Sequence, residues 1–267
     1  MSFQPIIPMS GLGGWAFLSR TRAKQEATFN ATPMLQREAT YFRDKIADIR
    51  SADDLVKDRR LLRVALGAFG LQQDLDNRAF IRQVIEGGSE DRRALANRLS
   101  DKRYLALAQG FAHLAKGADP TLAPDGLADR LITRFKGREF EVAVGEQDQT
   151  MRMALAFQRD LPALVQDYKT ETSRWYGALG NPPLRQVLET SLGLPKEFGL
   201  LDIDDQVVRM RKALQQRFGT TDLSDITSPD SIEKVTRRFM VMQQLREIQT
   251  QISPGNGALF LLQSARR

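Results

Sequence analysis

Apolar side chains recur at helical spacing along most of the chain, and the clearest case runs from Tyr41 to Leu71. Phe42, Ile46 and Ile49 fall on one face of a helix, and a short polar joint separates this face from a second one. The second face is wider and comprises Leu61, Leu62, Val64, Ala65, Ala68 and Phe69. The pattern therefore predicts two helices with a short connection.

Polar residues and glycines mark the expected ends of these helices. Ser51 is a favourable N-cap, and Asp54 stands three residues later, at the position that completes a capping box. Asp58 is expected to cap the second helix. Gly70 follows the last apolar residue, where a left-handed conformation costs glycine least.

The same signals predict helices over most of the remaining chain. Their approximate ranges are 33–50, 52–57, 58–69, 77–86, a segment capped by Ser89, a segment capped by Ser100 or Asp101, 151–166, 175–179, 183–193, 203–218 and 229–252. Pro162 is expected to kink or delimit its helix. Residues 131–144 are ambiguous, because Phe140, Val142 and Val144 alternate as in a strand, while Leu131, Phe135 and Val142 also fit a helix.

Residues 1–31 differ from the rest of the chain and are interpreted as an extended N-terminal arm. Two prolines and three glycines within residues 5–14 oppose regular structure. Trp15, Phe17 and Leu18 are nevertheless strongly apolar. Either the arm packs on the helical body, with Trp15 as its anchor, or these three side chains bind a partner protein or form part of an export signal.

Two parts of the chain repeat the same apolar pattern in the same order. Leu61, Val64, Phe69, Gly70 and Leu71 match residues 123 positions later, namely Leu184, Val187, Leu192, Gly193 and Leu194. Weaker matches lie at offsets of 115 and 128. Since the order is shared, we predict two related helical modules.

Turn-forming residues suggest where these modules end. Gly117, Pro120 and Pro124 mark a loop. The predicted division is an arm at 1–31, a first module at 32–117, a second module at 125–252 and a tail at 253–267. The tail begins with the turn-like sequence SPGN and becomes apolar at Leu259–Leu262.

Composition removes several classes of chemistry. The 267 residues include no cysteine and one histidine, His113, which excludes disulfides, thiolate nucleophiles and histidine-rich zinc sites within one chain. The net charge is +6, but the 39 basic and 33 acidic residues are interleaved, which favours a solvated mixed surface over a nucleic-acid footprint. No apolar run approaches the ~20 residues of a membrane span, and no secretory signal pattern is present.

Clusters of charged residues have a structural and a chemical interpretation. Asp202, Asp204 and Asp205 could bind a cation, but they lack the pattern of a calcium loop, so helix capping is preferred. The same holds for Asp74 and Asp76. Three further groups are also interpreted as structural. Asp58, Arg59 and Arg60 are expected to form a helix cap with an ion pair, and Asn97, Asp101 and Arg103 to connect a loop to the adjacent helix. His113, Glu139 and Glu141 are interpreted as packed or surface residues.

Methionines give the last long helix an adaptable apolar face. Met240, Met242 and Leu245 lie near Phe239 and Ile248 at helical spacing. Methionine fills gaps in cores and also suits promiscuous interfaces. A core role is the preferred interpretation.

Three motifs occur in the order KDRRLLRVALGAFGL, DNRAFIRQVIEGG and ANRLSDKRY. Together they resemble a helical family of unknown function that is known mainly from alphaproteobacteria and is often encoded beside flagellar genes. The resemblance extends from about Phe3 to Leu262. It implies a helical fold, including a helix over the ambiguous residues 131–144, and a flagellar context, and it implies no catalytic residues.

The sequence therefore predicts an all-α protein of two related multi-helix modules packed together, with an extended N-terminal arm. We expect no enzymatic activity, no cofactor, and no catalytic or metal site. The leading hypothesis is a flagellum-associated structural or assembly factor that binds a protein partner, a flagellar component, and is cytoplasmic or flagellum-associated. A basic helical protein that binds nucleic acid is the alternative, and an enzyme is a third possibility.

Overall fold

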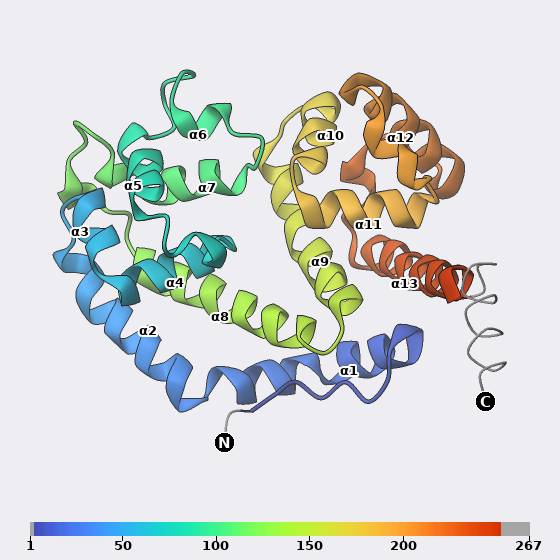
Figure 1. Ribbon diagram of the computed structural model, residues 1–267, viewed down its shortest axis with the longest axis horizontal. Helices are drawn as coiled ribbons and strands as arrows, with labels where there is room; N and C mark the ends of the chain where they lie inside the picture. Colours follow the sequence, from blue (N-terminus) through green and yellow to red (C-terminus); the bar gives the residue numbers. More distant parts are fainter. Residues whose placement is uncertain (1–2, 252–267) are drawn as a thin grey trace, which may run out of the picture. The chain divides into compact units, whose positions relative to one another are not determined.

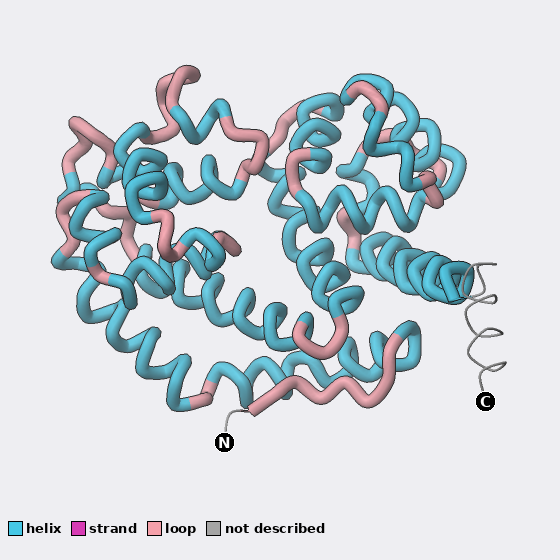
Figure 2. Tube along the Cα trace, in the orientation of Figure 1, coloured by secondary structure: helices cyan, strands magenta, loops and turns pink. Residues whose placement is uncertain are grey.

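The computed structural model describes residues 3–251 (Figure 1). Within this range the chain forms thirteen α-helices joined by short 3-10 turns and loops, and it contains no strand (Figure 2). The prediction of an all-α fold is confirmed. The ambiguous residues 131–144 are part of a helix, as predicted. The predicted tail at 253–267 lies outside the described residues.

Contacts divide the chain into two compact units. Unit 1 holds the residues up to Ile7 together with Leu18–Gln147, and unit 2 holds Pro8–Phe17 together with the residues from Asp148 on. The border therefore follows the helix at residues 127–145, whereas the sequence suggested the loop at 117–124. The segment that was predicted to be the arm contributes residues to both units.

One helix, α1 (Gly11–Asn30), carries residues of both units. The remaining helices of unit 1 are α2 (Pro33–Lys45), α3 (Ala52–Lys57), α4 (Arg59–Phe69), α5 (Arg78–Gly87), α6 (Leu95–Arg98), α7 (Arg103–Gly110) and α8 (Leu127–Gly145). Unit 2 continues with α9 (Gln149–Asp167), α10 (Glu171–Leu179), α11 (Pro182–Leu192), α12 (Ile203–Phe218) and α13 (Pro229–Gln251). None of the helices in the described part of the chain is both long and apolar enough to span a membrane.

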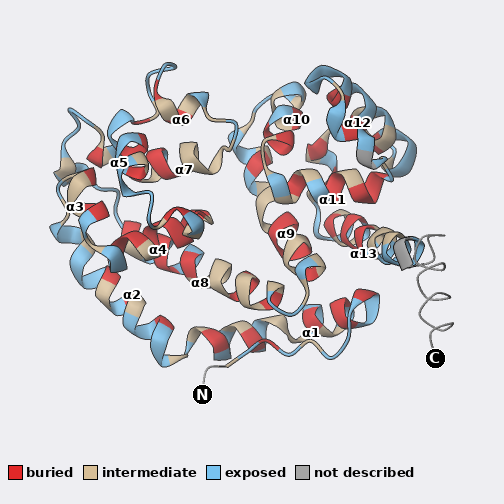
Figure 3. Cartoon of the chain, in the orientation of Figure 1, coloured by how far each residue is buried: buried red, intermediate tan, exposed pale blue. Residues whose placement is uncertain are grey.

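Each unit is built around one short central helix. In unit 1, α4 packs against α2, α3, α7 and, most extensively, α8. Every residue from Val64 to Phe69 is buried, and Figure 3 shows the buried residues along this helix. In unit 2, α11 packs against α9, α10, α12 and α13. The wide apolar face predicted for residues 61–69 is thus the centre of a core.

The two central helices begin and end in the same way. Asp58 and Asn181, 123 positions apart, are their N-caps, and each side chain accepts a backbone N–H of the first turn. At the other ends, Gly70 and Gly193 adopt left-handed conformations with φ of 73° and 76°. Both ends close with the paired backbone hydrogen bonds of a Schellman motif. The repeated pattern in the sequence therefore corresponds to a repeated structure.

The N-terminal segment differs from expectation, because residues 11–30 are helical rather than extended. The glycines lower helix propensity by about 1 kcal/mol each, but Trp15 and Leu18 are buried, and tertiary packing supplies most helical stability in proteins. Gly14 has its own reason, since a Cβ there would collide with the backbone oxygen of Met9. The glycines thus permit close packing of the chain on itself.

Two local predictions were wrong. Ser89 does not cap a helix, because the helix there is the four-residue α6, which begins after Ala94. Asp76 pairs with Arg59 at 2.5 Å instead of capping α5, whose N-cap is Asn77. In both cases a longer-range contact or a neighbouring residue replaced the expected local bond. Asp101, by contrast, accepts the backbone N–H of Arg103 in the first turn of α7 at 3.0 Å, as a capping residue does.

Proline within α9 does not end that helix. The helix continues through Pro162 to Asp167. Leu161 and Leu164, on either side of the proline, are buried. We infer that the burial of these side chains offsets the backbone hydrogen bond that proline cannot make.

Candidate functional site

Arginines close the C-terminal end of α4 in unit 1. Arg138 on α8 donates from Nε to the backbone oxygen of Ala68 at 3.0 Å, and Arg103 on α7 donates from Nη1 to the oxygen of Gly70. Arg103 also donates from Nε and Nη2 to the carboxylate of Asp101, at 3.0 and 2.6 Å. Burial alone would lower the pKa of Arg103, but the bond to Asp101 outweighs it and raises the pKa. The guanidinium is therefore a permanently charged structural tie.

A second network in unit 1 surrounds a buried carboxylate. Asp74 is 7% exposed and accepts hydrogen bonds from the hydroxyl of Tyr104, at 2.8 Å, and from Nδ2 of Asn77, at 2.9 Å. Burial, together with the bond to Asp74, raises the pKa of Tyr104 to about 12. The hydroxyl is therefore protonated at neutral pH and acts as a donor. The ring of Phe80 packs edge-on against Tyr104.

These two networks join the three motifs that the sequence analysis singled out. Gly70 closes the first motif, Asn77 belongs to the second, and Arg103 and Tyr104 close the third. Asn97, also in the third motif, donates to the backbone oxygens of Ser89 and Asp91. The motif residues are thus bonded to one another or to the local backbone, which explains them as parts of the fold.

The group around Asp58 is a helix cap and not an anion site. Asp58 accepts the backbone N–H groups of Arg60 and Leu61 and the hydroxyl of Tyr41, the last at 2.6 Å. Arg60 stacks on the Tyr41 ring and pairs with Glu38 at 3.3 Å. The structural interpretation of this group is therefore confirmed.

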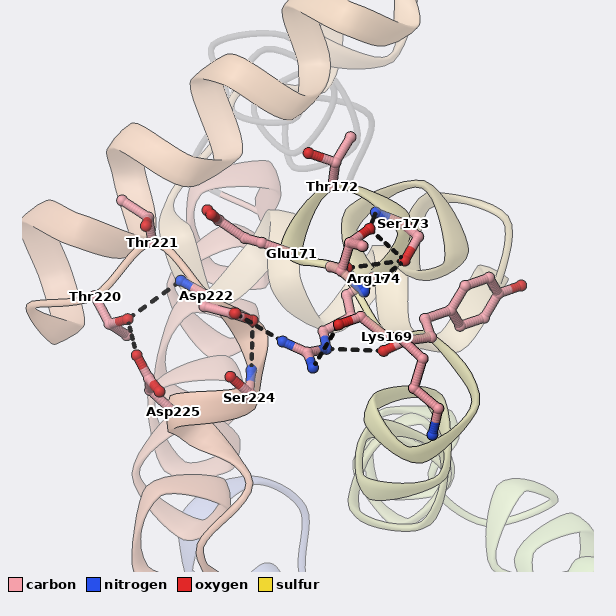
Figure 4. Close-up of polar contacts among 12 residues, drawn as sticks. Lys169, Glu171, Thr172, Ser173, Arg174, Thr220, Thr221, Asp222, Ser224 and Asp225 are labelled. Carbon is pink, nitrogen blue, oxygen red and sulfur yellow. Dashed lines mark hydrogen bonds and ion pairs between the residues drawn. The ribbon is translucent and has the colours of Figure 1, made fainter.

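Unit 2 has a comparable network between two loops (Figure 4). Arg174 donates to Asp222 at 2.7 Å and to the backbone oxygens of Tyr168 and Lys169. The indole N–H of Trp175 donates to the backbone oxygen of Thr221 at 2.9 Å. These bonds connect the residues before and within α10 to the loop that follows α12.

The same network continues within the loop after α12. Asp222 also accepts the backbone N–H of Ser224, and the hydroxyl of Thr220 donates to the carboxylate of Asp225 (Figure 4). Glu171 pairs with Arg211 of α12 at 3.1 Å. The sequence analysis missed this network, because Arg174 and Asp222 are far apart in the chain and no local pattern links them.

The C-terminal end of α11 is also closed by two arginines. Arg238 donates from Nε to the backbone oxygen of Ser191 at 2.6 Å, and Arg246 donates from Nη2 to that of Leu194 at 2.8 Å. Ser191 stands 123 positions after Ala68, the acceptor in unit 1. Both arginines lie on α13, where no local sequence pattern indicated a capping role.

The acidic residues at the start of α12 serve that helix. Asp202 accepts the backbone N–H of Asp204 at 3.0 Å and is the N-cap. Asp204 accepts a hydrogen bond from the hydroxyl of Tyr176. Within residues 3–251, no group of three or more acidic or histidine side chains is placed to hold a metal ion. The capping interpretation of Asp202 is confirmed.

The remaining candidates are distributed over unit 1. Glu139 pairs with Arg63 at 3.5 Å, and Glu141, on the same helix, is buried. His113 lies in a 3-10 turn beside Phe111, and burial lowers its pKa. Nδ1 of His113 has no hydrogen-bond partner among the described residues. This side chain is packed, as predicted.

The three residues predicted to bind a partner differ in exposure. Trp15 is 2% exposed and Leu18 is fully buried, while Phe17 is partly exposed. The indole N–H of Trp15 points to Glu233 of α13 at 3.4 Å. The packing of Trp15 agrees with its predicted role as an anchor, and binding of a partner by these residues stays a prediction.

One apolar surface in unit 2 is not used for packing among the described residues. Val241, Leu245 and Ile248, spaced at i, i+4 and i+7 on α13, are 38%, 46% and 50% exposed. We call these three residues the α13 stripe. The sequence favoured a core role for Leu245 and Ile248, and this was wrong, whereas Phe239 and Met240 are buried. Figure 3 shows α13 changing from buried to exposed toward its C-terminal end.

The start of α1 lies next to the α13 stripe. A Cβ on Gly11 would collide with the side chain of Gln244, so the two residues are in contact. Gln244 shares its helix face with Val241 and Ile248, which stand three residues before and four after it. Leu12, adjacent to Gly11, is 38% exposed. The first turn of α1 therefore lies beside α13 at Gln244.

Comparison with known proteins adds a family and a fold. The family model described as "Protein of unknown function (DUF1217)" matches residues 68–232. The crystal structure of a protein from Agrobacterium tumefaciens, determined by a structural genomics consortium, is similar with a TM-score of 0.73 and 28% sequence identity. That similarity covers 91% of this chain and 99% of the other. No curated protein matches this sequence.

These findings bear out the sequence-based resemblance in its coarser form. A family of unknown function and an alphaproteobacterial relative were expected, and both are found. The matched residues include parts of all three motifs and the Arg174–Asp222 network, and they exclude the α13 stripe. Because the family model spans more than half of the sequence, this chain belongs to the DUF1217 family of proteins of unknown function.

Proposed function

We propose that this protein is a non-enzymatic structural or assembly factor, associated with the flagellum, that acts by binding another protein through unit 2. The observation that carries the proposal is the contrast between its polar and apolar side chains. Arg103, Arg174 and Asp222 are bonded within the fold, while the α13 stripe leaves three large apolar side chains exposed in a row. Contiguous exposed apolar surface is typical of protein-binding sites.

The form of the stripe favours a helical or extended protein segment as ligand. Apolar residues at i, i+4 and i+7 are the pattern by which one helix packs against another. Gln244 and Gln249, four residues before Ile248 and four after Leu245, supply polar groups without charge beside this face. Such a surface suits apolar contact more than electrostatic attraction.

The flagellar context comes from the family resemblance of the sequence. It supports the choice of partner, a flagellar component, and a location in the cytoplasm or at the flagellum. The net charge of +6 is the sole support for nucleic acid as an alternative ligand.

A pull-down from motile cells tests the proposal. Tagged wild-type protein is expected to capture a flagellar component, and Leu245→Lys is expected to lose it. Val208→Lys is the matched control, because Val208 is 62% exposed on α12 and lies outside the stripe. Equal capture by both variants would remove the stripe from the proposal, and capture of nucleic acid by all three proteins would favour the alternative.

A further inference from the structure

The α13 stripe stands at the end of the helix from which the last part of the sequence departs. Ile248 is three residues before Gln251, the last residue of α13. Val241 is ten residues before Gln251, which corresponds to about 15 Å along a helix. A segment that follows α13 and reverses along its exposed face would therefore lie against the stripe.

The sequence after α13 has the composition needed for such a reversal. Ser253-Pro254-Gly255-Asn256 places proline and glycine at the two central positions that a type II turn requires. Leu259-Phe260-Leu261-Leu262 then follows as four consecutive apolar residues. Leu259 is eight residues after Gln251, and eight steps along an extended chain can span up to roughly 26 Å. The connection is therefore long enough to reach every residue of the stripe.

The α13 stripe and the segment Leu259–Leu262 both consist of large apolar side chains. Three exposed side chains of α13 form one set, and the four residues from Leu259 to Leu262 form the other. Each large apolar side chain that is removed from water stabilises the docked arrangement. A covalent connection also raises the local concentration of the segment to the millimolar range for short flexible linkers.

We propose that Leu259–Leu262 of the same chain occupy the α13 stripe, and that a protein partner gains access to the stripe by displacing them. The segment is thus an internal competitor of the partner. The competition rests on the proposed function, whereas the docking of the segment does not. The two parts are therefore tested separately.

The absence of cysteine from the chain makes disulfide trapping a clean test of docking. Leu245→Cys combined with Leu261→Cys is expected to form an intramolecular disulfide under mild oxidation, because docking brings the two Cα atoms within about 7 Å. Val208→Cys combined with Leu261→Cys is the control. The first pair is expected to react at least ~10-fold faster, a ratio that corresponds to about 1.4 kcal/mol of preference.

Two results of the trapping experiment would overturn the proposal. Equal rates for the two pairs would mean that the segment has no preferred seat on α13. A disulfide that joins two chains, identified by its doubled mass, would make a second copy the occupant. Hydrogen exchange of residues 257–262 is the independent measurement: protection in wild type and in Val208→Lys, and its loss in Leu245→Lys, are expected, and equal exchange in all three proteins would also overturn docking.

Partner capture tests the competition. Phe260→Asp in the full-length chain is expected to release the segment and to increase capture in the pull-down severalfold. Unchanged capture, in a protein whose disulfide trapping supports docking, would overturn competition alone. Failure of wild type and Phe260→Asp to capture any protein would instead count against the proposed function.

Discussion

The central helices α4 and α11 are closed at their C-terminal ends by the same chemistry, delivered in different ways. In unit 1, the two arginines come from two helices, Arg103 from α7 and Arg138 from α8. In unit 2, Arg238 and Arg246 both come from α13. The C-terminal end of a helix exposes carbonyl oxygens and carries a partial negative charge. A guanidinium there donates hydrogen bonds to the oxygens and interacts favourably with the charge. Unit 2 concentrates this task on a single helix.

This difference has a consequence for how each unit responds to damage. The loss of one helix in unit 1 would leave one arginine at the end of α4. The loss of α13 would remove both arginines from α11, together with the buried Phe239 and the hydrogen-bond acceptor of Trp15. Loss of α13 is therefore expected to damage unit 2 more than loss of α7 or α8 alone damages unit 1. The same helix presents the α13 stripe.

The largest expected effect comes from the two cores. Phe69→Ala in unit 1 and Phe239→Ala in unit 2 are each expected to lower the free energy of unfolding by ~3–5 kcal/mol, since both rings are buried. Urea denaturation followed by circular dichroism measures the loss. Midpoints close to wild type for either variant would mean that the ring contributes little to its unit.

The arginine pairs give the next largest effect. Arg138→Met and Arg238→Met, which remove corresponding guanidiniums, are each expected to cost about 1.5–3 kcal/mol, because hydrogen bonds to charged groups are the stronger class. Methionine keeps much of the side-chain volume, so that the loss reports on the bond. A loss in one unit and none in the other, measured by denaturation, would show that the two ends are not equivalent.

A smaller effect is expected on the pH dependence of stability, because the N-cap of α4, Asp58, titrates and the N-cap of α11, Asn181, does not. Burial opposes ionisation of Asp58, but the bonds from Tyr41 and from the backbone N–H groups outweigh it and lower the pKa of Asp58. Because the folded pKa lies below the unfolded value, the stabilisation is present above the unfolded pKa of ~3.9 and is lost as the pH falls through the folded pKa.

The corresponding N-cap in unit 2, Asn181, does not titrate. Asp58→Asn is therefore expected to flatten the decrease of melting temperature with acid below about pH 4, while lowering stability at pH 7. Melting curves from pH 2.5 to pH 7 measure this, with Asn181→Asp as the reciprocal variant, which should steepen the acid limb. An unchanged acid limb in Asp58→Asn would contradict the assigned role of this carboxylate.

The smallest effect belongs to the stripe. Val208→Lys is expected to change the free energy of unfolding by less than about 0.5 kcal/mol, since substitutions at exposed positions usually do. Leu245→Lys is expected to cost more than Val208→Lys, because it also releases Leu259–Leu262 from the stripe. Thermal melting checks this directly. Equal melting temperatures for the two variants would contradict the docking of Leu259–Leu262 on the stripe.

Local signals explain what could be predicted from the sequence. Ser51, Asp58, Gly70 and Gly193 act through bonds to residues two to five positions away, and each was found as expected. The apolar periodicity located α4 and α11 for the same reason, because the period of a helix depends on adjacent turns alone.

Long-range contacts explain what could not be predicted. Arg174 meets Asp222 across 48 positions, and Arg238 reaches Ser191 across 47, with no pattern in either segment that indicates the other. Residues 11–30 form a helix despite their glycines, because Trp15 and Leu18 are buried by distant parts of the chain. The exposure of Leu245 likewise depends on which distant parts of the chain pack against α13, and the local pattern does not indicate this.

The contact between Trp15 and Glu233 can form only late in the synthesis of the chain. The two residues are 218 positions apart, so the indole is made ~10–40 s before its partner at the usual rate of 5–20 residues per second. Throughout that interval the nascent chain carries an apolar side chain, Trp15, whose hydrogen-bond acceptor in α13 does not yet exist. Translation speed and chaperone supply are therefore expected to affect the yield of folded protein more than its stability once complete.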